Sequence, residues 1–220
     1  MNETTRHTNQ KRGKFIVLEG GDGSGKSTNL AWIQQYLHQQ GVHCEIGREP
    51  GGTAIAEQLR QLILQPGHEP LDALSELLLL FAARNQHLTQ KIEPTLASGT
   101  WYVCDRFTDS TYAYQAGGRG MPKSQVQVLE QLVQGDMQPD CVFILDLSVE
   151  QRRQRLYERQ GTDRLEAQSN DFHERVRAQY LARAQANPDS HRVIDAFRSL
   201  ANVQQALKSH LDALITSHHG

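Results

Sequence analysis

Residues 19–28 read EGGDGSGKST and combine the residue types that bind phosphate groups. Their spacing meets the pattern Gly-x-x-x-x-Gly-Lys-Ser/Thr at Gly20, Gly25, Lys26 and Ser27. Glycines let successive backbone N–H groups turn inward, which creates a nest for an anion. The pattern therefore predicts a loop that holds the phosphates of a nucleoside triphosphate, formed by Gly20, Gly21, Asp22, Gly23, Ser24, Gly25, Lys26, Ser27 and Thr28.

Two side chains at the end of this stretch have separate chemical roles. Lys26 would place a mobile positive charge beside the β- and γ-phosphates, and the Ser27 hydroxyl would ligate Mg²⁺. A helix that begins here would add unpaired N–H groups and the positive end of its dipole. The alternative is a glycine-rich turn without a ligand. The apolar run Phe15–Leu18 before the loop and the helical pattern after it favour phosphate binding.

Asp105 and Arg106 directly follow a strand-like segment, Trp101–Cys104. Ligands gather at the carboxyl ends of strands in open α/β sheets. An aspartate there can hold Mg²⁺ or its waters, so Ser27 and Asp105 are the predicted metal ligands. An arginine there can clamp a phosphate through two hydrogen bonds. The alternative, a surface ion pair, is less favoured beside a phosphate-binding loop.

The rest of the chain alternates apolar runs with helical patterns, which is typical of an α/β fold with a parallel sheet. The expected strands are Lys14–Glu19, Val42–Gly47, Trp101–Cys104, Cys141–Leu147 and Arg192–Ile194. The expected helices are Ser24–Gln40, Ala54–Leu64, Leu71–Ala97, a Tyr-bearing helix that ends at Ala116, Pro122–Gln134, Val149–Gln160, Asn170–Ala186 and Leu200–Thr216. We expect the long helix Leu71–Ala97 to kink near Pro94, and His218 and His219 to be frayed.

The composition favours one cytoplasmic globular domain. The 220 residues are 38% hydrophobic and carry a formal net charge of −2, so nothing indicates bulk nucleic-acid or membrane binding. The longest apolar run, Leu77–Ala83, is too short to span a membrane. Three separated cysteines without a C-x-x-C pair favour free thiols in a reducing compartment. We expect residues 1–13 to be a disordered tail and residues 14–220 to form the domain.

Five stretches together resemble the bacterial branch of the thymidylate kinase family. They are EGGDGSGKST, REPGGT at Arg48–Thr53, FAARNQH at Phe81–His87, DRFTDSTYAYQAGGRG at Asp105–Gly120 and DRLE at Asp163–Glu166. The resemblance runs from about Lys14 to the C-terminus and keeps the order of the motifs. It implies a P-loop kinase fold with a five-stranded parallel sheet and a mobile lid. It also implies transfer of the γ-phosphoryl group of ATP to dTMP, with Mg²⁺, usually by a homodimer.

The resemblance implies a set of residues that hold dTMP. Arg106 would bind its phosphate, Asp22 would approach the 3′-hydroxyl region, and Glu49 would lie beside the sugar and phosphate. Tyr114 would lie against the deoxyribose, where its bulk disfavours a 2′-hydroxyl. The full implied set is Asp22, Glu49, Arg60, Phe81, Arg84, Asp105, Arg106, Thr111, Tyr114 and Gln115.

The thymine edge would be read by Arg84 and Gln115, supported by Thr111 and Arg60. A site that pairs fully with one base edge rejects a base whose polar groups mismatch it. Arg60 could instead be a solvated helix charge, and Thr111 could serve packing alone.

One position departs from the family pattern. Many relatives have an aromatic residue four positions before the helix arginine, where it stacks on thymine, but this chain has Leu80 there and Phe81 one position later. One residue turns a helix by about 100°, so the two side chains cannot offer the same face. We expect Phe81 to cover the base, with Leu80 or a core role for Phe81 as alternatives.

A second feature concerns the cations. Eukaryotic relatives carry an arginine in the phosphate loop where this chain has Gly23, whereas bacterial relatives place arginines in a lid, here about residues 150–167. This chain has there Arg152, Arg153, Arg155, Arg159 and Arg164. A solvated basic helix face is the alternative. The predicted catalytic set is Lys26, Arg106, Arg155 and Arg159, with Arg155 helping to hold ATP.

Two rival functions remain open at this point. A kinase for another deoxynucleoside monophosphate, such as dUMP or dGMP, would share the loop but lack the set Arg84, Thr111 and Gln115. A nucleotide-sensing P-loop protein would not need the second motif at Asp105–Gly120.

The spacing of the lid arginines generates a test. Arg152, Arg155 and Arg159 share one helix face, whereas Arg153 points aside. An arginine supplied to the transferred phosphoryl group is worth about 10³–10⁵ in kcat in related reactions. Arg159→Ala should therefore lower kcat at least about a hundredfold while the KM values move only a few-fold. Arg153→Ala is the matched control, and a loss of kcat in that variant instead would contradict the helical-face argument.

Overall fold

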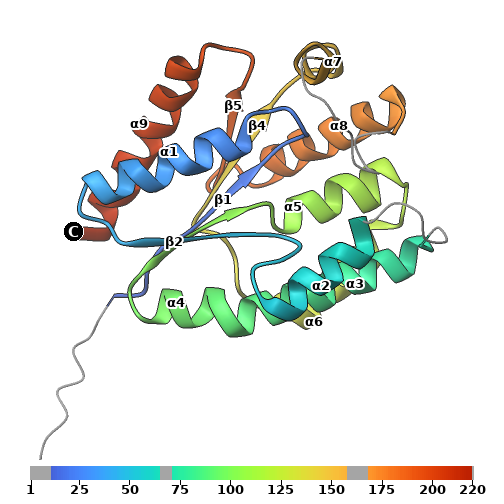
Figure 1. The fold of residues 1–220 in the computed structure, drawn as a ribbon, viewed down its shortest axis with the longest axis horizontal. Helices are drawn as coiled ribbons and strands as arrows, with labels where there is room; N and C mark the ends of the chain where they lie inside the picture. Colours follow the sequence, from blue (N-terminus) through green and yellow to red (C-terminus); the bar gives the residue numbers. More distant parts are fainter. Residues whose placement is uncertain (1–10, 65–70, 158–167, 220) are drawn as a thin grey trace, which may run out of the picture.

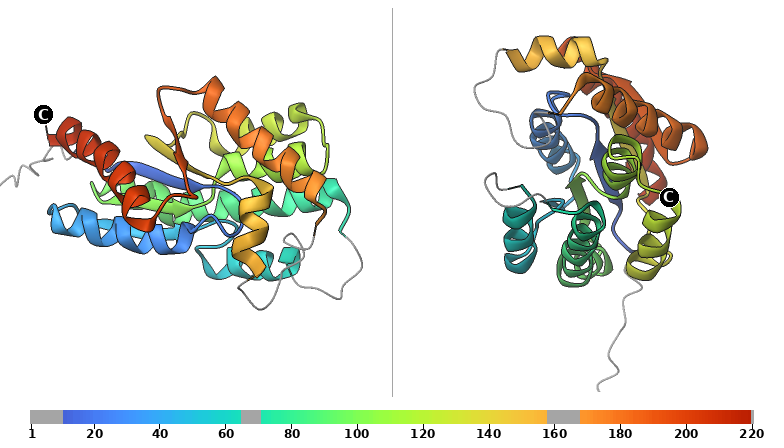
Figure 2. Two further views of the ribbon diagram at one scale, coloured as in Figure 1. Left: turned by 90° about the horizontal axis from the view of Figure 1, so that it is seen from above. Right: turned by 90° about the vertical axis from the view of Figure 1, so that its right-hand side faces the viewer.

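The structure, a computed structural model, describes residues 11–64, 71–157 and 168–219. Five parallel strands form one sheet in the order β2-β3-β1-β4-β5, with helices on both sides (Figures 1 and 2). The strands are β1 (Phe15–Glu19), β2 (Cys44–Arg48), β3 (Trp101–Asp105), β4 (Cys141–Asp146) and β5 (His191–Asp195). The predicted α/β fold with five parallel strands is confirmed.

The described helices connect these strands in chain order. They are α1 (Lys26–Gln39), α2 (Ala54–Leu64), α3 (Ala73–His87), η1 (Leu88–Ile92), α4 (Glu93–Ala97), α5 (Thr108–Thr111), η2 (Tyr112–Gly118), α6 (Lys123–Gln134), α7 (Val149–Tyr157), α8 (Asn170–Ala186) and α9 (Leu200–His219), where η1 and η2 are π-helical. Within this described part of the chain, no helix is long and apolar enough to cross a membrane.

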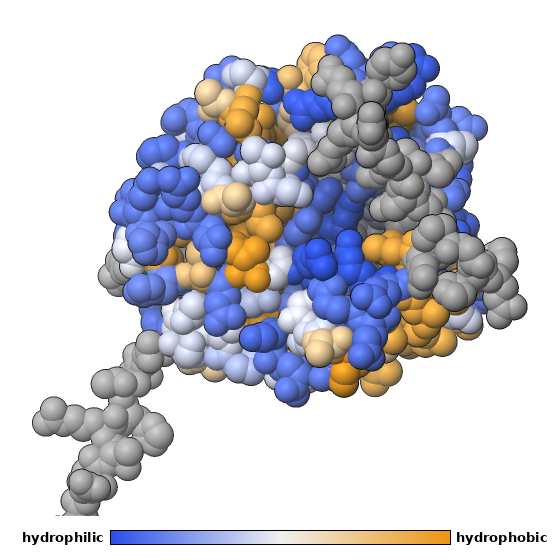
Figure 3. All heavy atoms as spheres, viewed as in Figure 1, coloured by the Kyte–Doolittle hydropathy of each residue, from blue (hydrophilic) through white to orange (hydrophobic). Residues whose placement is uncertain are grey.

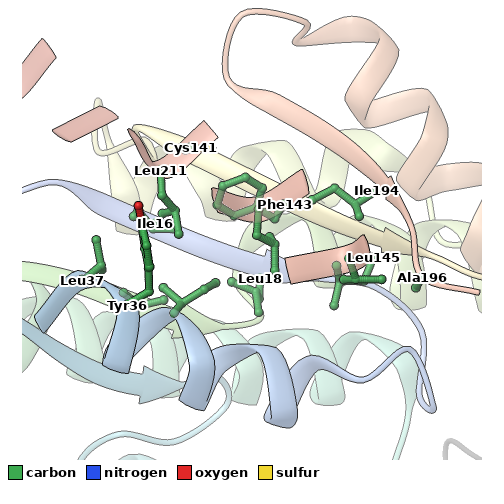
Figure 4. Packing of buried hydrophobic residues seen from close by; sticks show 14 of the residues in the cluster. Ile16, Leu18, Tyr36, Leu37, Cys141, Phe143, Leu145, Ile194, Ala196 and Leu211 are labelled. Atoms are coloured by element: carbon green, nitrogen blue, oxygen red, sulfur yellow. The ribbon is translucent and has the colours of Figure 1, made fainter. Parts of the chain in front are cut away.

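The central strand β1 is buried on both faces because successive side chains of a strand point in opposite directions. Ile16 and Leu18 pack toward α1 and α9, where they meet Leu37 and Leu211 (Figure 4). On the opposite face, Phe15 and Val17 pack with residues of η1, α4, η2 and α8. Burial of a large apolar side chain is worth about 1.5–3 kcal/mol, so this two-sided packing fixes where β1 ends and the phosphate loop begins.

The predicted single helix Leu71–Ala97 is wrong in detail. The helix begins at Ala73, where the Asp72 carboxylate caps the N–H groups of Leu74 and Ser75. It then widens into the π-helical turn η1 before continuing as α4. Pro94 lacks an N–H group and its ring would clash with the carbonyl four residues earlier, which favours a widened turn here.

The Tyr-bearing helix also differs from the prediction. It starts as α5 and continues as the π-helical segment η2 to Gly118, two residues beyond the expected end at Ala116. Gly118 lies so close to α8 that an added Cβ would be 2.5 Å from the Phe172 ring. Two glycines, 117 and 118, therefore let the widened segment rest against α8.

Both ends of the described chain depart from the expected fraying. Residues 11–13 belong to the fold: the Gly13 N–H donates to the Leu96 carbonyl at 2.8 Å, and Arg12 pairs with Asp140 at 3.0 Å. At the other end, α9 extends to His219, and the His218 ring packs edge-on against Trp101. Residues 1–10 of the predicted tail lie outside the described residues.

The loop after β2 packs against a buried histidine, and this contact can be tested. A Cβ added at Gly52 would lie 2.3 Å from His87 Nε2, whereas one at Gly41 would meet nothing within 4 Å. Both glycines have positive φ, 86° and 76°, so backbone strain is shared by the two alanine variants. Overpacking costs about 1–3 kcal/mol, and each kcal/mol lowers Tm by about 2–4 °C in a domain of this size.

We expect Gly52→Ala to melt roughly 2–12 °C below Gly41→Ala. Differential scanning calorimetry of the two variants measures this difference. Equal melting temperatures would show that the loop yields without strain.

Candidate active site

The phosphate loop lies between the end of β1 and the start of α1. An added Cβ at Gly20 would lie 2.5 Å from the Leu145 carbonyl oxygen, so strand β4 leaves room for glycine alone. Gly25 precedes α1 in a left-handed conformation with φ 86°. Lys26 Nζ donates to the carbonyls of Gly20 and Gly21 at 3.0 and 3.2 Å. The Lys26 amine lies beside the loop in a poorly solvated position, and this burial lowers its pKa.

Arg106 joins this loop to the end of β3. Its φ of 68° is the one positive value among non-glycine residues in the described ranges. This backbone conformation is costly for a residue with a Cβ and persists only where its surroundings hold it. Its N–H donates to the Leu18 carbonyl at 2.8 Å. Its guanidinium donates to the Gly20 carbonyl at 3.1 Å and to an Asp22 carboxylate oxygen at 2.5 Å.

A second carboxylate faces Arg106 through two hydroxyl groups. Arg106 Nη1 donates to the Ser110 and Tyr180 hydroxyls, each at 3.1 Å. These hydroxyls in turn donate to Glu19 Oε2, at 2.6 and 3.1 Å. Glu19 Oε1 accepts the backbone N–H groups of Phe107 and Ser110 at 2.8 and 3.1 Å. Burial raises the pKa of Glu19 to about 7, while these donors favour its ionised form.

The two carboxylates beside Arg106 thus differ in their titration. Burial raises the pKa of Asp22, but the charges of Arg106 and Lys26 outweigh it and lower the value to about 2. Asp22 is therefore ionised at neutral pH. The Tyr114 hydroxyl donates to it at 3.1 Å, and the Tyr114 ring lies 5.0 Å from the Arg106 guanidinium carbon.

A buried ion pair joins the loop after β2 to α3. Glu49 and Arg84 are 4% and 3% exposed, and Arg84 Nε donates to Glu49 Oε2 at 2.7 Å. Glu49 Oε1 lies 3.1 Å from His87 Nδ1, and His87 Nε2 lies 2.8 Å from the Tyr102 hydroxyl. Burial raises the pKa of Glu49, but Arg84 and His87 outweigh it, so the net shift is downward.

The Arg84 guanidinium is fixed in plane as well. Its Nη2 donates to the Thr111 hydroxyl at 3.0 Å and its Nη1 to Gln134 Oε1 at 3.3 Å. The rings of Phe81 and Phe107 each lie 4.8 Å from its central carbon. Three of its five N–H groups are thus occupied, and up to two remain for a ligand.

These groups converge on one cavity. It is lined by Asp22, Glu49, Pro50, Arg60, Leu64, Leu80, Arg84, Arg106, Phe107, Ser110, Thr111, Tyr114 and Gln115. Eight of the ten predicted dTMP-binding residues are therefore brought together, and their roles remain predictions. Asp105 and Phe81 do not line it. Figure 3 shows hydrophilic residues gathered in the hollow right of the centre of this face.

Leu80 lines the cavity, and Phe81 does not. Phe81 is 2% exposed and packs with Leu77, Tyr112 and Val126, so the predicted place of Phe81 against the base is wrong for this cavity. The physical reason is the rotation of about 100° between neighbouring helix residues.

Sequence reasoning missed four lining residues. Phe107 and Ser110 lie inside the motif at Asp105–Gly120, and Pro50 lies in REPGGT, so motif membership was a signal for them. Leu64 follows Arg60 by four residues on α2, which places both on one helix face.

The predicted metal ligands are compatible with a hard cation. Ser27 and Asp105 offer a hydroxyl and a carboxylate, the oxygen donors that Mg²⁺ prefers. Asp105 Oδ1 is buried, and no hydrogen-bond donor reaches it from the described residues. Among the described residues, no group of three or more acidic, histidine or cysteine side chains is arranged to hold a metal ion.

The first residues of the predicted lid lie on α7. As the helical spacing predicts, Arg153 is exposed and pairs with Glu150, whereas Arg155 turns inward. Arg155 donates to the Gly23 carbonyl at 3.3 Å and to the Ala196 carbonyl at 2.6 Å, so it bridges the phosphate loop and the loop after β5. Arg159 and Arg164 lie outside the described residues.

Comparison with known proteins identifies similar chains. A family model described as thymidylate kinase matches residues 18–207. The thymidylate kinase of Chromohalobacter salexigens is 50% identical over 208 residues, covering 93% of this chain and 98% of that protein. The thymidylate kinase of Chromobacterium violaceum is 48% identical and covers 93% and 96%. The crystal structure of thymidylate kinase from Ehrlichia chaffeensis superposes with a TM-score of 0.75 at 34% identity, covering 91% of this chain and 99% of that one.

The buried pair Glu49–Arg84 gives a stability prediction. Removing one partner of a buried pair leaves the other charge uncompensated, at a cost of about 3–5 kcal/mol. Glu49→Gln should therefore lower the free energy of unfolding by about 3 kcal/mol at pH 7. The matched control is Glu57→Gln, because Glu57 pairs with Arg48 at 2.8 Å in an exposed position, where such a pair is worth about 0–1 kcal/mol.

The pH dependence follows from the lowered pKa of Glu49. Its stabilisation is fully present above the ordinary carboxyl pKa of 4.5 and is lost as pH falls toward the lower folded-state value. Urea unfolding at several pH values should show the Glu49→Gln deficit constant above about pH 6 and shrinking below about pH 4.5. Equal deficits in the Glu49 and Glu57 variants would contradict this account.

Proposed function

Because the chain belongs to the thymidylate kinase family, we propose that it transfers the γ-phosphoryl group of ATP to dTMP, giving dTDP and ADP. The observation that carries this proposal is the position of Arg106. Its guanidinium contacts the phosphate loop at Gly20, and Arg106 also lines the cavity that gathers the predicted dTMP-binding residues, hereafter the acceptor cavity. A single cation thus lies where a donor phosphate and an acceptor phosphate would meet.

The reaction needs little base catalysis. An oxygen of the dTMP phosphate attacks the γ-phosphorus, the bond from that phosphorus to the β–γ bridging oxygen breaks, and ADP leaves. Catalysis is then positioning and charge neutralisation. Lys26 neutralises the β- and γ-phosphates, and Arg106 holds the acceptor phosphate. Arg155 helps to hold ATP, and Arg159 is proposed for the charge that develops on the transferred group.

We include Mg²⁺ in the proposal, held by Ser27 and Asp105 or their waters together with the ATP phosphates. When bound, this ion neutralises the β- and γ-phosphate oxygens. Asp105 Oδ1, which is buried and accepts no hydrogen bond from the described residues, supports this assignment.

The acceptor cavity supports a pyrimidine monophosphate. Arg84 and Gln115 would read the base, Leu80 would cover its face, and Tyr114 would lie against the sugar. Arg106 and Asp22, which pair with each other, would face the phosphate and sugar, whereas Glu49 pairs with Arg84. No described feature favours a kinase for another monophosphate or a nucleotide sensor.

A homodimer and a cytoplasmic location complete the proposal. In the described ranges, six of the nine exposed large hydrophobic residues lie on α2, α3 and α6: Ile55, Leu62, Leu74, Leu78, Val128 and Leu132. Hydrophobic residues gather at the lower right edge in Figure 3, where Figure 1 places α3 and α6. A second copy would cover this face, and light scattering that gives the mass of one chain would exclude it. All three cysteines are free, which suits a reducing compartment.

A coupled assay of ADP release tests the function. With ATP and each deoxynucleoside monophosphate in turn, we expect dTMP to give the highest kcat/KM. Lys26→Met should abolish transfer and barely change Tm without nucleotide, because Lys26 contacts carbonyls of its own loop. Preference for another monophosphate would overturn the acceptor assignment. Wild-type turnover by Lys26→Met would contradict the proposed role of the phosphate loop.

A further inference from the structure

Gln115 lines the cavity and hydrogen-bonds a buried carboxylate, Glu76, that is not among the lining residues. Its Nε2 donates to Glu76 Oε1 at 3.0 Å, and the two side chains are 3% and 1% exposed. Glu76 comes from α3 and Gln115 from η2, so the contact joins the two elements that carry the proposed base-reading residues. Contacts of this kind restrict the rotation of a buried amide.

Arg119 pairs with the Glu76 carboxylate through two hydrogen bonds. Arg119 Nε donates to Glu76 Oε1 at 2.7 Å and Arg119 Nη2 donates to Glu76 Oε2 at 2.8 Å, which is a two-bond pairing of opposite charges. An ionised carboxylate accepts hydrogen bonds and cannot donate one. The Gln115 atom that faces Glu76 must therefore be the amide nitrogen.

The Gln115 amide oxygen is consequently directed away from Glu76. Gln115 lines the cavity, and none of the described residues donates to its Oε1. The cavity is thus offered a hydrogen-bond acceptor by Gln115 and donors by Arg84. A pyrimidine dione has an N3–H donor between two carbonyl acceptors, and it matches this pattern. Cytosine has an unprotonated N3 and an amino group at position 4, so it would oppose acceptor to acceptor and donor to donor.

We propose that Glu76 is a positioning residue that sets acceptor specificity, because it locks the Gln115 amide with its oxygen toward the base and so selects a dione over cytosine. This rests on the proposed function, since it assumes that the cavity takes the base of a monophosphate. Glu76 does not touch the base. It gives no discrimination between dTMP and dUMP, whose hydrogen-bonding edges are identical.

The test compares three acceptors, dTMP, dUMP and dCMP, in the wild-type protein and in Glu76→Gln. A glutamine at position 76 can offer either its oxygen or its nitrogen, so the Gln115 amide is free to turn. Losing a hydrogen bond changes a binding constant about tenfold, and leaving a polar group unpaired changes it by a similar factor. We expect the dTMP:dCMP ratio of kcat/KM to fall at least about tenfold. The dTMP:dUMP ratio and the KM for ATP should stay unchanged.

A charge-swapped variant provides the rescue. In Glu76→Gln/Gln115→Glu, the amide nitrogen at position 76 can donate to the carboxylate at position 115, whose other oxygen accepts from N3–H. This variant keeps the charge of the cluster and should recover most of the dTMP:dCMP ratio. Thermal melting of both variants shows whether folded protein has been lost. Such a loss would lower kcat/KM for all three acceptors alike and leave their ratios unchanged.

The outcomes separate this inference from the function on which it rests. If the wild-type protein does not phosphorylate dTMP, the proposed function fails, whatever the variants do. If it does, an unchanged dTMP:dCMP ratio in Glu76→Gln overturns the role of Glu76. Failure of the swapped variant to recover that ratio overturns it equally, because orientation of the amide would then not be the cause.

Discussion

The structure depends on one partly buried guanidinium at the carboxyl ends of β1 and β3. Arg106 has a left-handed backbone, and its side chain has two anionic counterparts of unlike kind. Asp22 pairs with it directly and stays ionised far below neutral pH, whereas Glu19 meets it only through two hydroxyl groups and titrates near neutrality. The Arg106 guanidinium can therefore pair with a phosphate while the groups toward Glu19 still compensate its charge. Strand β1 is buried on both faces, and this packing fixes the position of Glu19 and of the phosphate loop that follows it.

The same design recurs around Arg84, which lines the same cavity. Its guanidinium donates to Glu49, Thr111 and Gln134, and two aromatic rings each lie 4.8 Å from its central carbon. A donor fixed in this way loses little freedom when a ligand arrives, so more of the interaction is available for affinity and specificity. The cavity is therefore built from side chains whose positions are set by buried partners from other elements.

Local sequence predicted the parts of the site that depend on neighbouring residues. The phosphate loop and the strand before it are contiguous in the sequence, as Asp105 and Arg106 are with each other. Their glycines and charges therefore predict the site from local sequence alone. Spacing on one helix correctly separated Arg153 from Arg155. By contrast, Glu19 reads as the end of an apolar strand, and its partner Tyr180 is 161 residues away. Glu76 reads as a polar position at the start of a leucine-rich helix, and its partner Arg119 is 43 residues away. The choice between Leu80 and Phe81 depends on helix rotation, which motif matching alone could not fix.

The π-helical segment η2 has a consequence for how the chain tolerates changes in length. A π-helical turn holds one more residue than an α-helical turn, so the loss of one residue from η2 could be absorbed by an ordinary α-helix. Folding would survive such a deletion, but Arg119 would turn by about 100° relative to Tyr114 and Gln115. The Gly117 and Gly118 carbonyls, which accept from Arg175 of α8 at 3.2 and 2.7 Å, would shift with it. A deletion of one residue in η2 would therefore alter the contacts around Gln115 and Arg119, on which the proposed choice of base depends.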